Sequence, residues 1–421
     1  MKHFFFIDDT LRNKISYYNI LLFLVSLPFD RFYSQIVLIS FTIHTVIQLR
    51  NYPARSILSK PVFILTAIYF LNLIGILYSV DKTQGLYDIE KQLAILLFPV
   101  IFYLNGLDLG KYRKRLLQVF GITCTVTILY LYFDALHIIR YNRLPYSSLF
   151  TYAFINQNFS SSIELHATYL SMYVALSLTF LLYLLAHETA FWKRILFGVS
   201  VLICCGGLLQ LSSRAVFISV IIIVALILPF FLLKGVKRMK VIIITSLIII
   251  AAIFSITRIG IFKERWVTSL KSDLDPNFVY TELSEPRAVR WKSAWELIRR
   301  SPVVGYGSGS EIKLLKDKYF ENKLFVSYLD ELNAHNQYLS FFIKYGIIGL
   351  MLYLFTLSYG FLKAWKNKDA VFFSFMVLIA IVSLSENILD VNKGIFFYGF
   401  FFSFFIFADK NNRIPAYFKQ E

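Results

Sequence analysis

The sequence contains few cysteines and few charged residues, and each shortage excludes certain classes of protein. Only three of its 421 residues are cysteine, and these residues, Cys124, Cys204 and Cys205, all fall inside apolar runs. This placement indicates neither a disulfide framework nor a zinc site. Charged residues make up 16% of the chain and hydrophobic residues 57%. That balance excludes a water-soluble globular domain of this length and favours a protein whose solvent is lipid.

The sequence also lacks the usual marks of a metal, nucleotide or nucleic-acid site. No carboxylate cluster or histidine pair has the spacing of metal ligands, so we expect no metal and no cofactor. The glycine cluster at 303–310 has neither a P-loop lysine nor a preceding strand, and we interpret it as a flexible turn rather than a phosphate loop. The net charge of +17 does not indicate nucleic acid, because most Lys and Arg lie in short clusters between apolar runs.

Long apolar runs dominate the chain. A helix needs about 20 apolar residues to cross about 30 Å of hydrocarbon. The runs predict an all-helical (all-α) integral membrane protein with about twelve transmembrane helices, the first of which we expect to be an uncleaved span. They lie at 17–29, 33–49, 61–80, 89–104, 116–138, 165–186, 195–211, 214–233, 239–257, 336–361, 370–387 and 394–408.

The distribution of basic residues gives these spans an orientation. With the N-terminus inside, 22 Lys and Arg fall in the cytoplasmic segments and five in the short loops on the other side. This asymmetry predicts a multi-pass membrane protein with both termini in the cytoplasm. Residues 1–257 then form an N-terminal bundle of about nine spans, 258–335 a large extracytoplasmic loop, and 336–421 a C-terminal bundle of about three spans with a cytoplasmic tail.

The segment 258–335 differs in kind from the spans. It carries thirteen basic and eleven acidic residues. The preference for basic residues on the cytoplasmic side applies to short loops only, so these charges do not contradict the predicted orientation. Within it, 288–300 places apolar residues at helical spacing and then meets Ser301 and Pro302, which predicts a helix that stops there. The stretch 311–332 is a second amphipathic candidate. We therefore expect amphipathic helices inside the loop.

Three arginines near the predicted outer surface are candidates for anion binding. Arg214 lies at a junction between two spans with almost no loop, where it is either a snorkelling anchor or an anion clamp. Arg287 and Arg290 are three residues apart and so share one side of a helix. A loop arginine is by default a solvated surface charge, and the alternative for this pair is a phosphate or carboxylate site.

A histidine stands where the tenth predicted span begins. His335 can simply help to cap that helix together with Asn336. The alternative is chemical, since an imidazole can accept a hydroxyl proton near neutral pH, which is worth about 10²–10⁴ in rate. His166, Lys91 and Glu386 are further polar residues near outer span ends, and we regard them, together with Asn336, as secondary candidates.

Taken together, these elements resemble the signature region of the O-antigen ligase and O-antigen polymerase superfamily. The resemblance is strongest over 205–355 and depends on the order and spacing of the motifs. The matching motifs are an arginine four residues before a tryptophan (Arg287, Trp291), a Pro-x-x-Gly-x-Gly turn (Pro302, Gly305, Gly307), His-Asn before a span (His335, Asn336) and Gly-x-x-Gly within it (Gly346, Gly349).

The resemblance implies a metal-independent membrane glycosyltransferase whose donor is a glycan carried on undecaprenyl diphosphate. It also implies a place in the bacterial inner membrane, with 258–335 as a periplasmic loop. Carried over by position, it implies that Arg214 and Arg287 hold the diphosphate and that His335 orients or deprotonates the attacking hydroxyl. The chain departs from the family pattern in having Arg290 as well, and the spacing to Trp291 favours Arg287. The partners it implies are the lipid-linked glycan, a lipid or glycan acceptor and membrane lipid.

The sequence leaves two alternatives to a ligase open. A ligase would transfer the glycan to a lipid A-core sugar, whereas a polymerase would join two lipid-linked repeat units, and the motifs are common to both. The large loop with a single late histidine resembles the ligase branch, so we favour a ligase. A transporter for lipid-linked sugars would instead predict broken helices in two related halves with polar residues near the midplane of each. In this sequence the polar residues gather toward the outer side, which favours an enzyme over a transporter.

Overall fold

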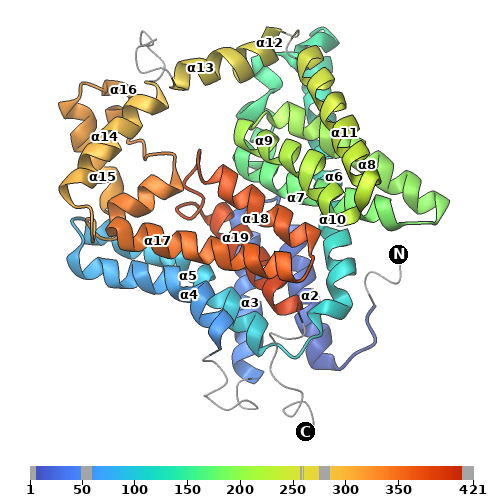
Figure 1. The fold of residues 1–421 in the computed structure, drawn as a ribbon, viewed down its shortest axis with the longest axis horizontal. Coiled ribbons are helices and arrows are strands. Elements are labelled where there is room, and N and C mark those ends of the chain that lie inside the picture. The colour runs from blue at the N-terminus through green and yellow to red at the C-terminus, as the bar shows by residue number, and fades with distance from the viewer. Residues whose placement is uncertain (1–5, 49–58, 257, 259, 275–284, 410–421) are drawn as a thin grey trace.

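The computed structural model describes residues 6–48, 59–256, 258, 260–274 and 285–409, and within them all regular structure is helical (Figure 1). The helices are α2 (Leu11–Ser26), α3 (Arg31–Gln48), α4 (Lys60–Gly75), α5 (Lys82–Leu104), α6 (Leu109–Tyr141), α7 (Ala167–His187), α8 (Phe191–Leu211), α9 (Arg214–Ile222), α10 (Leu228–Leu232), α11 (Gly235–Ile256), α12 (Gly260–Lys263), α13 (Ser269–Leu274), α14 (Arg287–Arg300), α15 (Ser310–Glu321), α16 (Phe325–Leu329), α17 (Gln337–Lys366), α18 (Ala370–Val382) and α19 (Asn392–Ala408). The predicted all-helical class is confirmed over this part of the chain.

Among the described residues, seven helical segments are long and apolar enough to cross a membrane. Two shorter apolar helices, α18 and α19, accompany them. Every predicted apolar run overlaps a helix, yet α2, α3 and α5 are too short or too polar to count among the seven, so the total of twelve spans stays a prediction. The seven are Lys60–Tyr78, Leu109–Tyr141, Ala167–His187, Phe191–Leu211, Arg214–Leu232, Gly235–Ser255 and Gln337–Lys366.

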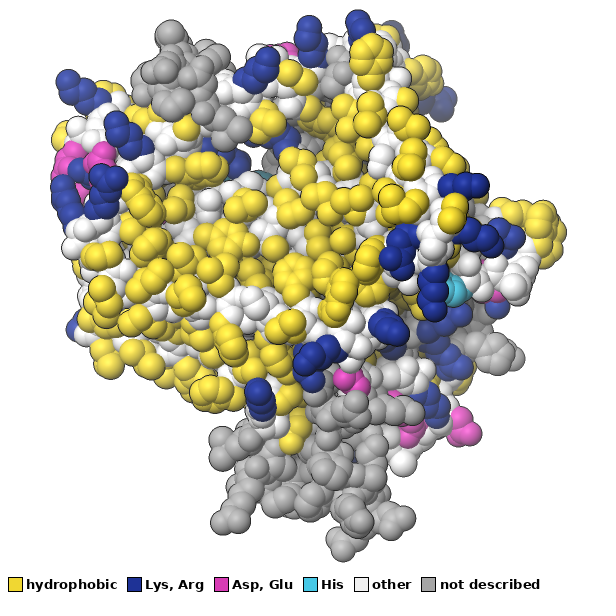
Figure 2. Space-filling view, viewed as in Figure 1, with side chains coloured by type: hydrophobic (Ala, Val, Ile, Leu, Met, Phe, Trp, Pro, Cys, Tyr) yellow, Lys and Arg dark blue, Asp and Glu magenta, His cyan; other side chains and the backbone are white. Residues whose placement is uncertain are grey.

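Aromatic rings fill the centre of the bundle. Helix α5 packs against α4 and α19, and α7 packs against α6, α8 and α18. The ring of Phe23 lies 4.9 Å from that of Phe98 and 4.8 Å from that of Phe400, which joins α2, α5 and α19. Such ring pairs add about 0.5–1.5 kcal/mol each beyond the burial of their area. Figure 2 shows that apolar side chains also cover much of the face seen there, as lipid contact requires.

The loop between α11 and α17 contains its own helices. Helix α14 ends at Arg300, immediately before Ser301 and Pro302, so the predicted stop is confirmed. The single helix predicted over 311–332 is wrong, because α15 ends at Glu321 and α16 starts only at Phe325. Lys323 adopts a left-handed conformation with φ of 58°, which a continuing helix does not allow.

A second, smaller apolar cluster holds these loop helices on the membrane bundle. Ala294 and Ile298 of α14 and Leu315 and Tyr319 of α15 bury their side chains together with Ile343 of α17. Figure 1 shows α14, α15 and α16 grouped beside α17, with α12 and α13 leading to them from the α11 side. The loop is therefore packed against the bundle rather than extended into solvent.

The glycine-rich segment does form a turn between α14 and α15, but it is packed rather than free. Helix α17 is interrupted at Gly346, with φ of 62° and ψ of −157°, and this break frees carbonyls in the preceding turn. The N–H groups of Tyr306 and Gly307 donate to two of them, Ile343 O at 3.0 Å and Lys344 O at 2.7 Å. The glycines therefore permit a close approach of two backbones, and the turn docks the loop on a membrane helix.

Candidate active site

Arg214 is placed by a sharp junction between two apolar helices. Helix α8 ends at Leu211, Ser212 takes a left-handed conformation with φ of 48°, and α9 begins at Arg214. The indole N–H of Trp266 donates a hydrogen bond of 2.7 Å to the Ser212 hydroxyl. This bond ties the segment that follows α11 to the junction, and it brings α13 close to the arginine.

One carboxylate contacts two of the predicted diphosphate ligands. Arg214 Nη2 forms an ion pair with Asp273 Oδ2, and Arg287 Nε lies 3.9 Å from the same oxygen. Arg287 is the first residue of α14, and its Nη1 donates to the backbone carbonyl of Ser385 at 3.0 Å. Arg214 Nη1 is buried and has no hydrogen-bond partner in the described residues. Two guanidinium groups from different helices therefore contact the Asp273 carboxylate, and they have further N–H donors that can bind a second anion.

His335 is held by its neighbours in an unusual backbone conformation. Its φ is 45°, in the left-handed region that non-glycine residues seldom occupy. The preceding N–H, of Ala334, donates to Glu311 Oε1 at 3.0 Å, and the following N–H, of Asn336, donates to Asn387 Oδ1 at 2.8 Å. Asn336 also caps α17 by accepting from two N–H groups of its first turn. The secondary candidate Asn336 thus has a structural position, next to the histidine it helps to fix.

A buried carboxylate pairs with the imidazole of His335. His335 Nδ1 lies 3.5 Å from Glu386 Oε2, in the turn that follows α18. Burial raises the pKa of Glu386, but the contact with His335 and the charges of His335, Arg287 and His166 outweigh it and hold this pKa below its usual value. Glu386 is therefore ionised at neutral pH and is suited to stabilise a protonated imidazole.

His166 interacts electrostatically with Glu386 and with His335. It is the N-cap of α7, where its Nδ1 accepts from the Thr168 N–H at 3.3 Å, so the proton of the neutral ring is on Nε2. Burial lowers the pKa of His166, the carboxylate of Glu386 raises it in part, and the ring of His335 lowers it. His166 is consequently a neutral neighbour of the site rather than a second cation at neutral pH.

These contacts bring the predicted residues together from separate parts of the chain. We call Arg214, Asp273, Arg287, His335 and Glu386 the arginine–histidine cluster. Asp273 joins the two arginines, and Arg287 bonds the residue next to Glu386, which in turn faces His335. Figure 2 shows a hollow in the surface below α13, with basic side chains at its edge, between the helices that supply these residues.

Arg290, the other predicted phosphate ligand, points into the loop core instead. It is only 6% exposed, and burial lowers its pKa. The buried Tyr319 of α15 has the largest electrostatic effect on it among ionisable neighbours that also include Asp273, and the Nε and Nη1 of Arg290 have no hydrogen-bond partner in the described residues. Arg287 rather than Arg290 therefore contacts both Asp273 and the turn that holds Glu386.

Lys91 lies outside the arginine–histidine cluster. Its Nζ is 3.9 Å from Asp88 and 4.1 Å from the centre of the Tyr87 ring, all on α5. These contacts are all within the middle of α5, and the structure does not bring Lys91 to the other candidates. Its secondary role therefore has no contact to support it.

Sequence reasoning missed a buried charge network beneath His335. Lys344 of α17 donates to Asp390 at 2.8 Å and lies 3.5 Å from Glu311, and all three side chains are largely buried. Asn387 donates to both carboxylates, at 3.1 Å and 3.0 Å. Because Glu311 and Asn387 also hold the backbone on each side of His335, the network positions the histidine. The available signal was an ionisable residue, Lys344, inside an apolar run.

Residues 199–354 match the model of a family described as O-Antigen ligase. The match includes Arg214, Arg287 and His335 together with the glycine-rich turn and the break in α17, and it stops before Glu386. It confirms the resemblance proposed from the motifs over 205–355. No curated protein matches the chain.

Proposed function

Since the chain carries an O-antigen ligase family domain over residues 199–354 of a multi-pass membrane protein, we propose that it is a glycosyltransferase for lipid-linked glycans. Its donor would be a glycan on undecaprenyl diphosphate, and its acceptor a hydroxyl on lipid A-core or a similar molecule. The reaction would take place on the outer side of the inner membrane, with both termini in the cytoplasm and about twelve spans. The observation that carries the proposal is the shared anion contact of Arg214 and Arg287 beside the His335–Glu386 pair.

The arginines would act on the leaving group. As the bond between the anomeric carbon and the diphosphate oxygen breaks, negative charge grows on the diphosphate, and fixed guanidinium groups favour that state over the ground state. Arg287 is held by the Ser385 carbonyl, so its position does not depend on the ligand. We assign phosphate binding to Arg214 and Arg287, and we place Arg290 in the support of α14. This charge stabilisation needs no metal.

The histidine would act on the acceptor. With its Nδ1 3.5 Å from Glu386, His335 would use Nε2 to take the proton of the attacking hydroxyl. The acceptor oxygen then bonds to the anomeric carbon while undecaprenyl diphosphate leaves with the bonding electrons. The positive charge that develops on the imidazole is balanced by Glu386. A single displacement of this kind inverts the anomeric configuration.

Transfer in vitro tests the proposal. The purified chain in detergent would be given a synthetic undecaprenyl-diphosphate glycan with either lipid A-core or a second lipid-linked unit, with and without chelator. We expect chelator-resistant transfer that falls about 10²–10⁴-fold in His335→Ala. The matched control is His137→Ala, because His137 is an exposed histidine of α6.

Each outcome of that assay has a distinct meaning. Transfer to lipid A-core alone identifies a ligase, and transfer to the second lipid-linked unit alone identifies a polymerase, the alternative member of the same family. Loss of transfer in the presence of chelator contradicts metal independence. If neither acceptor is glycosylated and the lipid-linked glycan moves across a proteoliposome membrane, the protein is a transporter and the proposed enzyme activity is wrong.

A further inference from the structure

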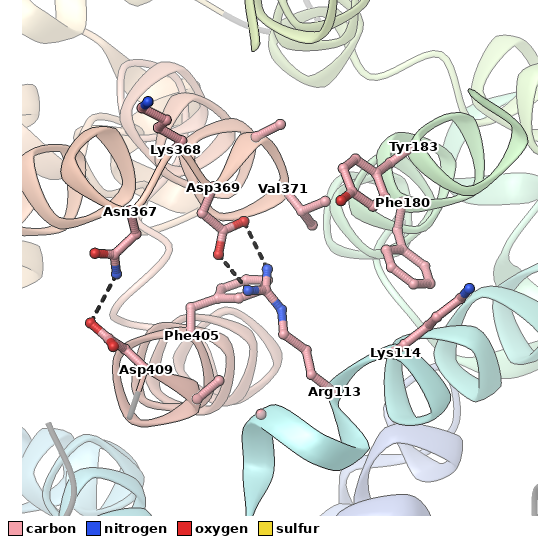
Figure 3. A pocket seen from close by; sticks show the side chains of 13 residues that line it. Arg113, Lys114, Phe180, Tyr183, Asn367, Lys368, Asp369, Val371, Phe405 and Asp409 are labelled. Atoms are coloured by element: carbon pink, nitrogen blue, oxygen red, sulfur yellow. Dashed lines mark hydrogen bonds and ion pairs between the residues drawn. The ribbon is translucent and has the colours of Figure 1, made fainter. Parts of the chain in front are cut away.

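A cavity of about 780 Å³ lies at the end of the bundle opposite the arginine–histidine cluster. It is lined by the start of α6, the end of α7, the start of α18 and the end of α19 (Figure 3). Helix α18 runs from Ala370 at this cavity to Val382, shortly before Glu386, so the two sites are at opposite ends of one helix. The proposed transfer reaction does not use this cavity.

Part of the charge in the cavity is already neutralised. The guanidinium of Arg113 donates through Nη1 and Nη2 to the two oxygens of Asp369, with 2.8 Å between Nη2 and Oδ1, and it stacks over the Phe405 ring at 5.0 Å. Asp369 also caps α18 by accepting from the Phe372 N–H. This pair is therefore fixed, and it contributes no net charge to a ligand.

Two lysines in the lining remain for a ligand. Lys114 and Lys368 both line the cavity, and neither forms a salt bridge with a described residue. The remaining carboxylate of the lining, that of Asp409, accepts a hydrogen bond from Asn367 at 3.0 Å. With Arg113 paired to Asp369, the side chains of the lining carry one excess positive charge, which suits a phosphate diester.

The opposite wall of the cavity is aromatic. Phe180 and Tyr183 of α7 stack with their ring centres 6.4 Å apart, and Figure 3 shows both rings on the side of the cavity across from Lys368, near Lys114. Lysine ammonium groups beside aromatic rings at a helix end match the transition from headgroup to acyl chain. A soluble phosphate compound would use the charges but not this wall.

The position along the bundle indicates which lipid is available. The cavity lies among the basic clusters 111–115 and 363–368, which the charge asymmetry assigns to the cytoplasmic side. Basic pockets between membrane helices on that side bind the head groups of anionic lipids. We propose that this cavity binds the phosphate head group of an anionic phospholipid of the cytoplasmic leaflet. The inference does not depend on the proposed transfer activity.

Thermal unfolding of the full chain in detergent tests the site. Phosphatidylglycerol should raise the Tm of the wild type more than phosphatidylcholine of the same chain length. Lys114→Gln with Lys368→Gln should lose that difference, and we expect a loss of about 30-fold in lipid affinity, which corresponds to about 1 kcal/mol for each lysine. The control is Lys363→Gln with Lys366→Gln, which removes two charges at the same end of the bundle from residues outside the lining.

Every outcome bears on the inference. Equal shifts from the two lipids, or a phosphatidylglycerol shift that survives in the double variant, would overturn it. If inorganic phosphate alone reproduces the shift and the double variant abolishes it, the ligand is a soluble phosphate and the lipid assignment is wrong. Should the double variant not fold, each single variant is expected to lose about fivefold in affinity, measured as bound lipid by native mass spectrometry.

Discussion

Replacing Asp273 by asparagine should strengthen the binding of a lipid-linked diphosphate. This carboxylate contacts both Arg214 and Arg287, where the proposed donor would place its phosphate oxygens. A diphosphate would therefore compete with Asp273 for part of the two guanidinium groups. Asparagine keeps the shape of the side chain but removes the charge that competes.

The size of the effect follows from the exposure of the three side chains. Asp273 is 20% exposed, and the two arginines are 25% and 22% exposed, so their ion pairs are partly screened by water. Exposed pairs are worth about 0–1 kcal/mol, and we take about 1 kcal/mol for this shared contact. Its loss predicts a KM for the lipid-linked donor that is about fivefold lower, with little change in kcat.

Steady-state transfer at varied donor concentration measures the two constants separately. The matched control is Asp317→Asn, which removes one negative charge from an exposed residue of α15 in the same loop. The control should leave KM unchanged. If Asp273→Asn instead raises KM, or lowers kcat at constant KM, then Asp273 positions the arginines for the substrate, and the reasoning from competition is refuted.

Three further effects are expected. Lys344→Met would leave buried Asp390 without its partner and should destabilise the chain by about 3–5 kcal/mol, while adding Asp390→Asn should restore part of the Tm. Gly307→Ala would force a Cβ against a neighbouring backbone and lower the Tm, whereas Gly198→Ala, which meets open space, should not lower it. Because the folded pKa of His166 lies below 6.5, the unfolded chain binds the proton more readily, and stability falls as the pH drops below 6.5. His166→Asn keeps a capping acceptor and should reduce that fall, by at most about 1.4 kcal/mol per pH unit, as followed by Tm against pH.

The helices could be read from the sequence because length and hydropathy are local properties. Every apolar run coincides with a helix, and the stop at Ser301 follows from the proline after it. The break in α17 could not be read in this way. The break depends on a distant segment, the turn at 305–307. The N–H groups of that turn donate hydrogen bonds to the α17 carbonyls that the break frees. A glycine such as Gly346 permits such a break, but the neighbouring sequence does not indicate that the turn at 305–307 will pack against it.

The sequence predicts only those site residues that are unusual on their own, and it does not predict contacts between distant residues. Arg214 and His335 were found because a charge at a span end has a cost and therefore invites a functional explanation. Asp273 was not found, since an acidic residue in a charged loop is unremarkable until two arginines meet it. The spacing to Trp291 favours Arg287 over Arg290, but the physical reason is a bond to Ser385, almost a hundred residues away, which the sequence does not reveal.

The docking of the glycine-rich turn sets a limit on how this protein can be divided. The loop at 285–335 is not a self-contained cassette, because its N–H groups complete a helix that lies outside it, and Ser308 N also bonds the carbonyl of Gly75 at 3.2 Å. A chimera that exchanged this loop alone would leave open carbonyls in α17. The smallest transferable unit therefore includes the interrupted first half of α17 and the end of α4, so loop and membrane helices are constrained to change together.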